Sequence, residues 1–192
     1  MGKNHEVRII GGRFKRSKLP VPDAPGLRPT PDRVRETLFN WLGQDLGGWH
    51  CLDAFAGSGA LGFEAASRGA ASVLLVESVP ALAQSLRQTQ LRLAAATVQV
   101  RCGDALACLR QTPLASLDLI FVDPPFAAGL FDAALAAARP ALKPTGFLYL
   151  EAPHAFEAQA LADQGWQLQR HARAGQVHAH LLRPIVPATV SL

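Results

Sequence analysis

The chain has 192 residues, 49% of them hydrophobic and 18% charged, which is enough for one globular domain with a buried core. No apolar run approaches the length of a membrane span, and the polar N-terminus lacks the hydrophobic stretch of a signal peptide. The net charge of +4 lies entirely in residues 1–50, which carry nine Lys or Arg against five Asp or Glu.

The first thirty residues predict a basic hairpin. Strands over 7–10 and 14–21 flank the pair Gly11-Gly12, which is typical of a turn between antiparallel strands. A localised basic patch is typical of nucleic-acid binders, although a solvated, solubilising end of the chain is the alternative. The candidate nucleic-acid contacts are the cations of this segment: Arg8, Arg13, Lys15, Arg16, Lys18 and Arg28.

A helix is predicted next, with Thr30 as its N-cap and Pro31 in its first turn, ending near Leu42. Strands and helices then alternate along the chain. Strands are predicted over 51–55, 72–76, 97–101, 118–122 and 147–150, helices over 60–68, 79–95, 105–111, 127–138 and 156–163, and a closing antiparallel pair over 166–170 and 177–183. This alternation predicts an α/β fold with a mostly parallel sheet and helices on both faces.

Acidic residues stand at the ends of successive predicted strands. They are Asp53, Glu77, Asp104 and Asp123, with Glu151 after a fifth strand. Each acid alone could be a helix N-cap, but the carboxyl edge of an open α/β sheet is where ligands bind. The shared position therefore predicts a binding site at that edge.

Two prolines follow the fourth of these acids, in Asp123-Pro124-Pro125-Phe126. Neither proline can donate to a sheet ladder, so the strand ends here and the loop is stiff. A turn with no further role is the alternative for this motif considered by itself.

A glycine-rich turn follows the first of these strands. Gly57-Ser58-Gly59-Ala60-Leu61-Gly62 matches G-x-G-x-x-G, and Glu77 lies 20 residues after Gly57. This spacing also satisfies the dinucleotide fingerprint, so an NAD-dependent dehydrogenase is an open alternative. Asp53 argues against it, because a carboxylate there opposes a pyrophosphate and favours a ligand that carries a cationic amine or sulfonium.

The combination resembles the S-adenosylmethionine-dependent methyltransferases of the Rossmann-like, seven-stranded class. Asp53 to Gly59 is similar to their first motif, and Asp123-Pro124-Pro125-Phe126 to the motif of enzymes that methylate exocyclic amines. Over almost the whole chain the resemblance is closer still, to the RsmD family. The segments that carry it are Arg8 to Gly12, Leu19 to Pro22, Gly26 to Thr30, Asp32 to Leu42, Ala56 to Ala65 and Ser67 to Ala70. One departure is Arg16-Ser17-Lys18, where Arg-Gly-Arg is expected.

The resemblance implies methyl transfer from S-adenosylmethionine to the N2 amine of one guanine in 16S ribosomal RNA. It implies a methyltransferase domain over 31–192 and an RNA-binding hairpin extension over 1–30. The implied cofactor contacts are Thr30, Arg33, Asp53, Phe55, Ala56, Gly57, Gly59, Glu77, Asp104, Ala105 and Asp123. The implied catalytic residues are Asp123 and Pro124, which accept hydrogen bonds from the amine, and Phe126, which stacks on the base.

Two alternatives remain for the function. A DNA adenine-N6 methyltransferase shares the Asp-Pro-Pro-Phe motif, and a non-catalytic RNA-binding or assembly module could keep the same fold.

Three cysteines without paired spacing argue against disulfides and zinc. We therefore expect a cytoplasmic monomer without a metal ion or membrane association, acting on 16S rRNA in a small-subunit assembly particle.

Overall fold

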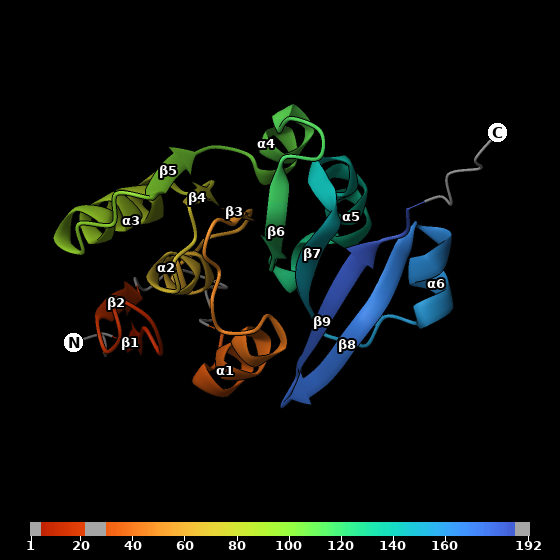
Figure 1. The fold of residues 1–192 in the computed structure, drawn as a ribbon, viewed down its shortest axis with the longest axis horizontal. Helices are drawn as coiled ribbons and strands as arrows, with labels where there is room; N and C mark the ends of the chain where they lie inside the picture. The colour runs from red at the N-terminus through yellow and green to blue at the C-terminus, as the bar shows by residue number, and fades with distance from the viewer. Residues whose placement is uncertain (1–4, 22–29, 187–192) are drawn as a thin grey trace.

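The computed structural model describes residues 5–21 and 30–186, and a seven-stranded sheet forms their centre (Figure 1). Its strand order is β5-β4-β3-β6-β7-β9-β8. The strands are β3 (His50–Asp53), β4 (Ser72–Glu77), β5 (Val98–Cys102), β6 (Leu117–Val122), β7 (Leu142–Ala152), β8 (Trp166–Ala174) and β9 (Val177–Pro184). Neighbours from β5 to β7 are parallel, and β9 is antiparallel to both β7 and β8. The predicted mostly parallel seven-stranded α/β fold is confirmed.

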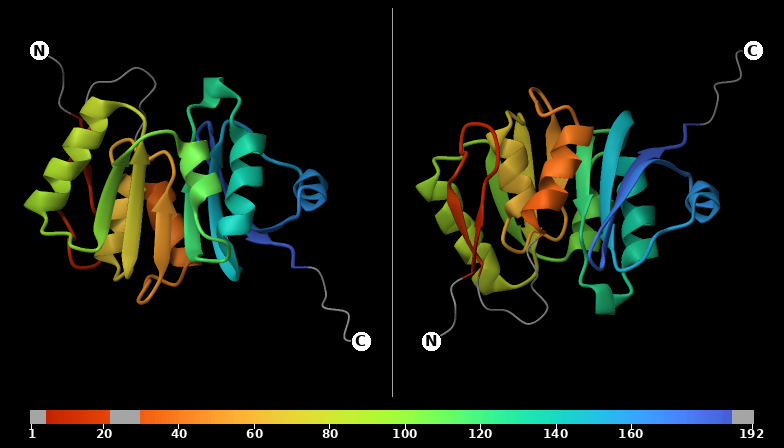
Figure 2. Two further views of the ribbon diagram at one scale, coloured as in Figure 1. Left: turned by 90° about the horizontal axis from the view of Figure 1, so that it is seen from above. Right: turned by 90° about the horizontal axis from the view of Figure 1, so that it is seen from below.

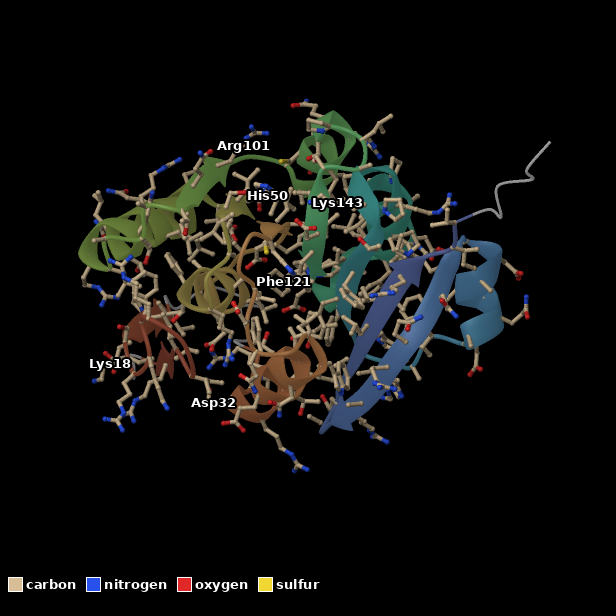
Figure 3. All side chains as sticks on the ribbon, viewed as in Figure 1. Lys18, Asp32, His50, Arg101, Phe121 and Lys143 are labelled. Carbon is tan, nitrogen blue, oxygen red and sulfur yellow. The ribbon has the colours of Figure 1, made fainter. Side chains whose placement is uncertain are left out.

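Helices cover both faces of the sheet (Figure 2). One face carries α1 (Asp32–Trp41), α2 (Ala60–Ser67) and α3 (Pro80–Arg92), and the other carries α4 (Ala105–Gln111), α5 (Phe131–Ala138) and α6 (Ala158–Asp163). A short turn of 3-10 helix, η2 (Arg139–Ala141), leads from α5 into β7. Neighbouring side chains of β6 serve opposite cores: Phe121, near the middle of the molecule in Figure 3, packs with the α1–α2 side, whereas Ile120 packs with the α4–α5 side. Among the described residues, no helix has the length and hydrophobicity that crossing a membrane requires.

The N-terminal hairpin pairs β1 (His5–Arg8) with β2 (Lys18–Val21); β1 begins two residues before its predicted start, and β2 is half as long as predicted. Residues 14–17 lie in the connecting loop, so the prediction of a strand from residue 14 is wrong. The loop packs closely on α2: Gly12 has φ +70°, and a Cβ there would lie 1.9 Å from the Ser67 carbonyl oxygen. The two glycines thus permit a close contact with α2, and a two-residue turn does not form.

A buried carboxylate fastens this loop to the helices. Glu64 of α2 is fully buried, and its oxygens accept the backbone N–H groups of Ile10 and Gly11, both at 2.8 Å. Arg35 of α1 and Arg68 also approach it, at 3.4 Å and 2.8 Å. A charged residue is rarely buried without partners, and here two guanidinium groups and two amides supply them. The hairpin loop is therefore held rigidly against α1 and α2.

Three other boundaries differ from the prediction. Helix α1 begins at Asp32 after Pro31, and no side chain caps it, so the prediction of Thr30 as the N-cap is wrong. Helix α5 begins only at Phe131, since residues 126–128 form a 3-10 turn, η1 (Phe126–Ala128), and Gly129 adopts φ +63°. Strand β7 begins at residue 142, five residues before its predicted start, with a register shift against β6.

Candidate active site

Five acidic side chains meet the C-terminal edge of the parallel strands, as the sequence predicts. Asp53 and Glu77 are the last residues of β3 and β4. Asp104 and Asp123 follow β5 and β6, and Glu151 is the penultimate residue of β7. Because β3, β6 and β7 are adjacent in the sheet, three of these carboxyl groups are neighbours.

The three neighbouring carboxyl groups interact, because the negative charge of Glu151 raises the pKa of both Asp53 and Asp123. Asp53 is 2% exposed, and burial raises its pKa to about 7, with Glu77 and Glu151 adding repulsion. Burial also raises the pKa of Asp123 well above its usual range, and the negative charges of Glu151 and Asp53 raise it further. A bound cation would lower these pKa values, so this edge of the sheet suits a positively charged ligand.

Glu151 has neighbouring groups that stabilise its ionised form. Burial raises its pKa, whereas hydrogen bonds from Thr30 and Tyr149 and the charge of Arg35 oppose that rise. The Tyr149 hydroxyl donates to Glu151 Oε1 at 2.8 Å, and burial raises the pKa of the tyrosine well above its usual range. Tyr149 was not predicted as a site residue, yet it stands two positions before Glu151 in a strand and therefore shares its face.

The glycines of the β3–α2 turn have separate packing roles. Gly59 adopts φ +77°, and a Cβ there would lie 2.7 Å from the Leu86 side chain. A Cβ on Gly62 would lie 2.1 Å from the Leu75 side chain, and the Gly62 N–H donates to Asp53 Oδ2 at 3.1 Å. The third glycine therefore lets α2 approach the sheet and orients the buried aspartate.

Glu77 points at the glycine turn. Its Oε2 accepts the Gly57 N–H at 2.9 Å and its Oε1 accepts the Val79 N–H at 2.8 Å. Each carboxylate oxygen keeps a second lone pair for a ligand hydroxyl. Asp104 is exposed and caps α4 by accepting the Ala107 N–H at 2.7 Å, with Ala105 buried as the first residue of that helix.

The Asp-Pro-Pro-Phe segment forms the loop after β6. Asp123 is half-buried at its start and Pro124 is buried. Phe126 begins η1 and is 37% exposed, with its ring centroid 6.3 Å from that of Phe131. Two hydrogen-bond acceptors, the Asp123 carboxylate and the Pro124 carbonyl, therefore lie in the same loop as a partly exposed aromatic ring.

The remaining predicted residues are distributed more widely. Phe55 is half-buried in the glycine turn, with Ala56 buried beside it. Arg33 is exposed on α1 and lines a small depression with Thr37 and with Arg173 of β8. The described hairpin cations are all exposed, and Lys18 pairs with Glu6 at 2.7 Å (Figure 3); these cations are Arg8, Arg13, Lys15, Arg16 and Lys18. Arg28 lies outside the described residues.

The described residues contain no group of three or more His, Cys, Asp or Glu arranged to hold a metal ion. A depression of about 330 Å³ lies where β3, β4 and β6 begin, lined by His50, Ser72 and Leu117 among others. It is therefore away from the strand ends that carry the acids.

The chain is similar to proteins named for methylation of ribosomal RNA. A family model described as conserved hypothetical protein 95 matches residues 7–183. A relative from Escherichia coli strain K12, named ribosomal RNA small subunit methyltransferase D, is 44% identical over 179 residues, covering 90% of this chain and 87% of the relative. A protein of the same name from Haemophilus influenzae is 38% identical over 181 residues, covering 92% and 93%.

Solved structures agree with this similarity. A putative methyltransferase, yhhF, from Escherichia coli has a TM-score of 0.78 at 40% identity, covering 94% of this chain and 98% of that one. A putative methylase from Haemophilus influenzae has a TM-score of 0.76 at 32% identity, covering 95% and 100%. The chain therefore belongs to the RsmD family, whose curated members carry the name ribosomal RNA small subunit methyltransferase D.

Proposed function

We propose that this chain transfers a methyl group from S-adenosylmethionine to the exocyclic N2 amine of a guanine in 16S ribosomal RNA. The observation that carries the proposal is the position of the Asp123-Pro124-Pro125-Phe126 loop beside a buried cluster of carboxyl groups whose pKa values are raised by burial. The names of the relatives support ribosomal RNA as the substrate.

The residues present fit this cofactor, which carries a sulfonium and an ammonium group. Asp53, Asp123 and Glu151 are buried carboxyl groups that a bound cation would stabilise in the ionised form, and their raised pKa values support a site that favours a cation. Glu77 retains lone pairs for the ribose hydroxyls, and Asp104 for the adenine amine. When bound, the cofactor supplies a methyl group already activated on sulfur.

The loop after β6 prepares the amine of the base. The lone pair of this nitrogen is delocalised into the ring, so the amine is a poor nucleophile. The Asp123 carboxylate and the Pro124 carbonyl can each accept a hydrogen bond from one N–H of the amine. These two hydrogen bonds draw the nitrogen toward tetrahedral geometry and expose its lone pair. Proline has no N–H that would compete with this interaction.

Phe126 offers a stacking surface for the base, worth roughly 1–3 kcal/mol per stacked base. A guanine in a duplex hides its N2 amine in a groove, so the target base must be unpaired or extruded. A cation beside Asp53 and Glu151 offsets their charge and lowers the pKa of Asp123. Cofactor binding therefore favours the ionised carboxylate that accepts the hydrogen bond.

The test uses Asp123→Ala together with Asp163→Ala, an exposed aspartate of α6 that serves as a matched control. Wild type and the control should place a labelled methyl group on N2 of guanine in small-subunit RNA, identified by mass analysis of nucleosides. Asp123→Ala should lose transfer by at least about a hundredfold, in keeping with the loss of a positioning hydrogen bond in a transition state. Calorimetry should show that this variant still binds the cofactor.

Three results would reject the proposal or its mechanism. Full activity of Asp123→Ala would remove the mechanism. N6-methyladenine in DNA as the product would favour the DNA methyltransferase. Failure of the wild type to bind S-adenosylmethionine would favour a non-catalytic RNA-binding module.

A further inference from the structure

A continuous series of aromatic rings runs from the loop after β6 to the β8–β9 hairpin. We call it the aromatic strip: Phe126, Phe131, His154, Phe156, His171 and His178. Successive ring centroids lie 6.3 Å apart from Phe126 to Phe131, 5.9 Å from Phe131 to Phe156, and 5.1 Å from Phe156 to His154. At the far end, the His171 and His178 rings are stacked with centroids 5.2 Å apart.

The strip lies at the same edge of the sheet as the acids. Phe131 begins α5 shortly after the Asp-Pro-Pro-Phe segment, and His154 and Phe156 follow the end of β7. His178 pairs with Ala152, the last residue of β7. The strip therefore leads away from the candidate catalytic loop along one edge of the sheet.

A buried histidine, His180, contacts both halves of the strip. His180 is fully buried, its Nε2 accepts the Phe156 N–H at 3.1 Å, and its ring meets that of Phe156 edge-on at 5.7 Å. The centroid of the His180 ring also lies 4.8 Å from that of the His171 ring. This histidine joins the two halves of the strip and fixes their orientation.

Much of the strip faces solvent. His154 and His171 are exposed, and Phe131, Phe156 and His178 are half-buried. Exposed aromatic rings in a row are uncommon on a surface that binds nothing, because each leaves apolar area in contact with water. The strip therefore has the character of a binding surface.

The positive charge of Arg173 at one end of the strip suits a nucleic acid, whereas the exposed acids Asp132 and Glu157 directly follow two of its phenylalanines. Arg173, which is exposed, pairs with His178 across the β8–β9 hairpin, and its Nε donates to the Gly175 carbonyl at 3.0 Å. This bond leaves the terminal guanidinium nitrogens at the tip of the hairpin. The nearby acid Asp132 is turned toward Gln164, which follows α6 and donates to it at 3.3 Å.

The histidines of the strip are suited to stacking. Burial lowers the pKa of His178, and His171, Arg173 and His154 lower it further. His171 Nε2 and His178 Nδ1 lie 3.0 Å apart, which requires one shared hydrogen and at least one neutral ring. Flat imidazole rings beside an arginine match the faces and the phosphates of unpaired nucleotides, whereas a duplex offers no base faces.

We infer that the aromatic strip binds the unpaired nucleotides that adjoin the target base, with bases stacked on its exposed histidines and a phosphate at Arg173. The inference rests on the proposed function, because the strip begins at Phe126, where the target base is expected. It adds a second RNA-binding surface, separate from the basic hairpin.

The test compares His154→Ala, His154→Phe and His50→Ala. His50 is an exposed histidine where β3 begins, away from the strip, and so provides a matched control. The probe is a short fluorescein-labelled single-stranded RNA of mixed sequence, titrated without cofactor and monitored by anisotropy. We expect His154→Ala to weaken binding roughly 5- to 150-fold, the effect of losing one stacked base, while His154→Phe and His50→Ala bind as the wild type does.

A second readout separates this inference from the proposed function. In methyl transfer to small subunits, His154→Ala should raise KM for the RNA substrate and leave kcat unchanged. Wild-type binding and KM in His154→Ala would overturn the inference while the proposed function stands, as would a loss of binding that His154→Phe does not restore. A wild type that transfers no methyl group would overturn the proposed function, and the anisotropy result would still decide whether the strip binds RNA.

Discussion

Replacing Asp53 with asparagine removes a carboxyl group that the fold buries among other acids. The folded-state pKa of Asp53 is raised from 3.8 to about 7, so the folded protein keeps this proton over a range in which the unfolded chain has lost it. Between these values the unfolded state binds fewer protons, and stability falls as pH rises. The asparagine side chain cannot ionise, and its amide oxygen can still accept the hydrogen bond from Gly62.

The size of the effect follows from the shift. A difference of about three pKa units corresponds to about 4 kcal/mol, of which roughly 2–3 kcal/mol is lost between pH 5 and pH 8. The free energy of unfolding of Asp53→Asn, minus that of the wild type, should therefore grow by this amount over the same range. Taking the change with pH cancels the part of the substitution that does not depend on ionisation.

Urea denaturation of both proteins at several pH values measures this difference. Asp104→Asn serves as the control, because Asp104 is exposed and the same substitution there removes no buried charge. Added S-adenosylmethionine should stabilise the wild type at pH 8 and have much less effect on Asp53→Asn. If the free energy of unfolding of Asp53→Asn minus that of the wild type stays constant or falls as pH rises, the reasoning that ionised Asp53 destabilises the fold is refuted.

Three further predictions concern the hairpin. Gly12→Ala should destabilise the protein by more than about 2 kcal/mol, since the added Cβ meets Ser67, whereas Gly43→Ala, with φ +89° and nothing within 4 Å, should cost about 1 kcal/mol; urea midpoints compare them. Glu64→Gln should cost roughly 3–5 kcal/mol because it leaves two buried guanidinium groups without their buried counter-charge, and a denaturation midpoint equal to that of the wild type would contradict the proposed fastening. Lys15→Gln should leave stability unchanged and lower by about 1 the slope of log affinity for RNA against log salt, measured by anisotropy.

The order of strands and helices could be predicted because its signals are local. Apolar runs, glycine turns and helix periodicity identify each element without its neighbours. The five acids could be assigned to one edge for the same reason, because parallel strands place their C-terminal ends together. The Rossmann-like sheet follows from these two observations.

The hairpin could not be predicted in detail because its geometry depends on distant residues. The pair Gly11-Gly12 resembles a turn in the sequence, but its contacts lie on α2, more than fifty residues later. Arg35 and Glu64 are charged residues on helices, which in isolation predict solvent-facing positions. Their mutual contact, at 3.4 Å, and the other partners that the tertiary structure brings to each of them make burial of both possible.

The aromatic strip illustrates the same limit. His171 and His178 are seven residues apart in sequence, and nothing local brings them to His154. The pairing of β7 with β9 and of β8 with β9 does so. Alternation along each strand shows which residues share a face, but the neighbour of that face depends on sheet order.

The fastening of the hairpin by Glu64 has a consequence for protein engineering. Because the hairpin is predicted to bind RNA, a designer who wishes to redirect this enzyme to another RNA would exchange residues 5–21 as one unit. The donor hairpin would have to place two backbone N–H groups where those of Ile10 and Gly11 now bind Glu64. A hairpin that displaced Glu64 would leave the buried guanidinium groups of Arg35 and Arg68 without their counter-charge. A workable exchange would therefore transplant the α2 helix with the hairpin, or keep the loop backbone and alter only its exposed cations.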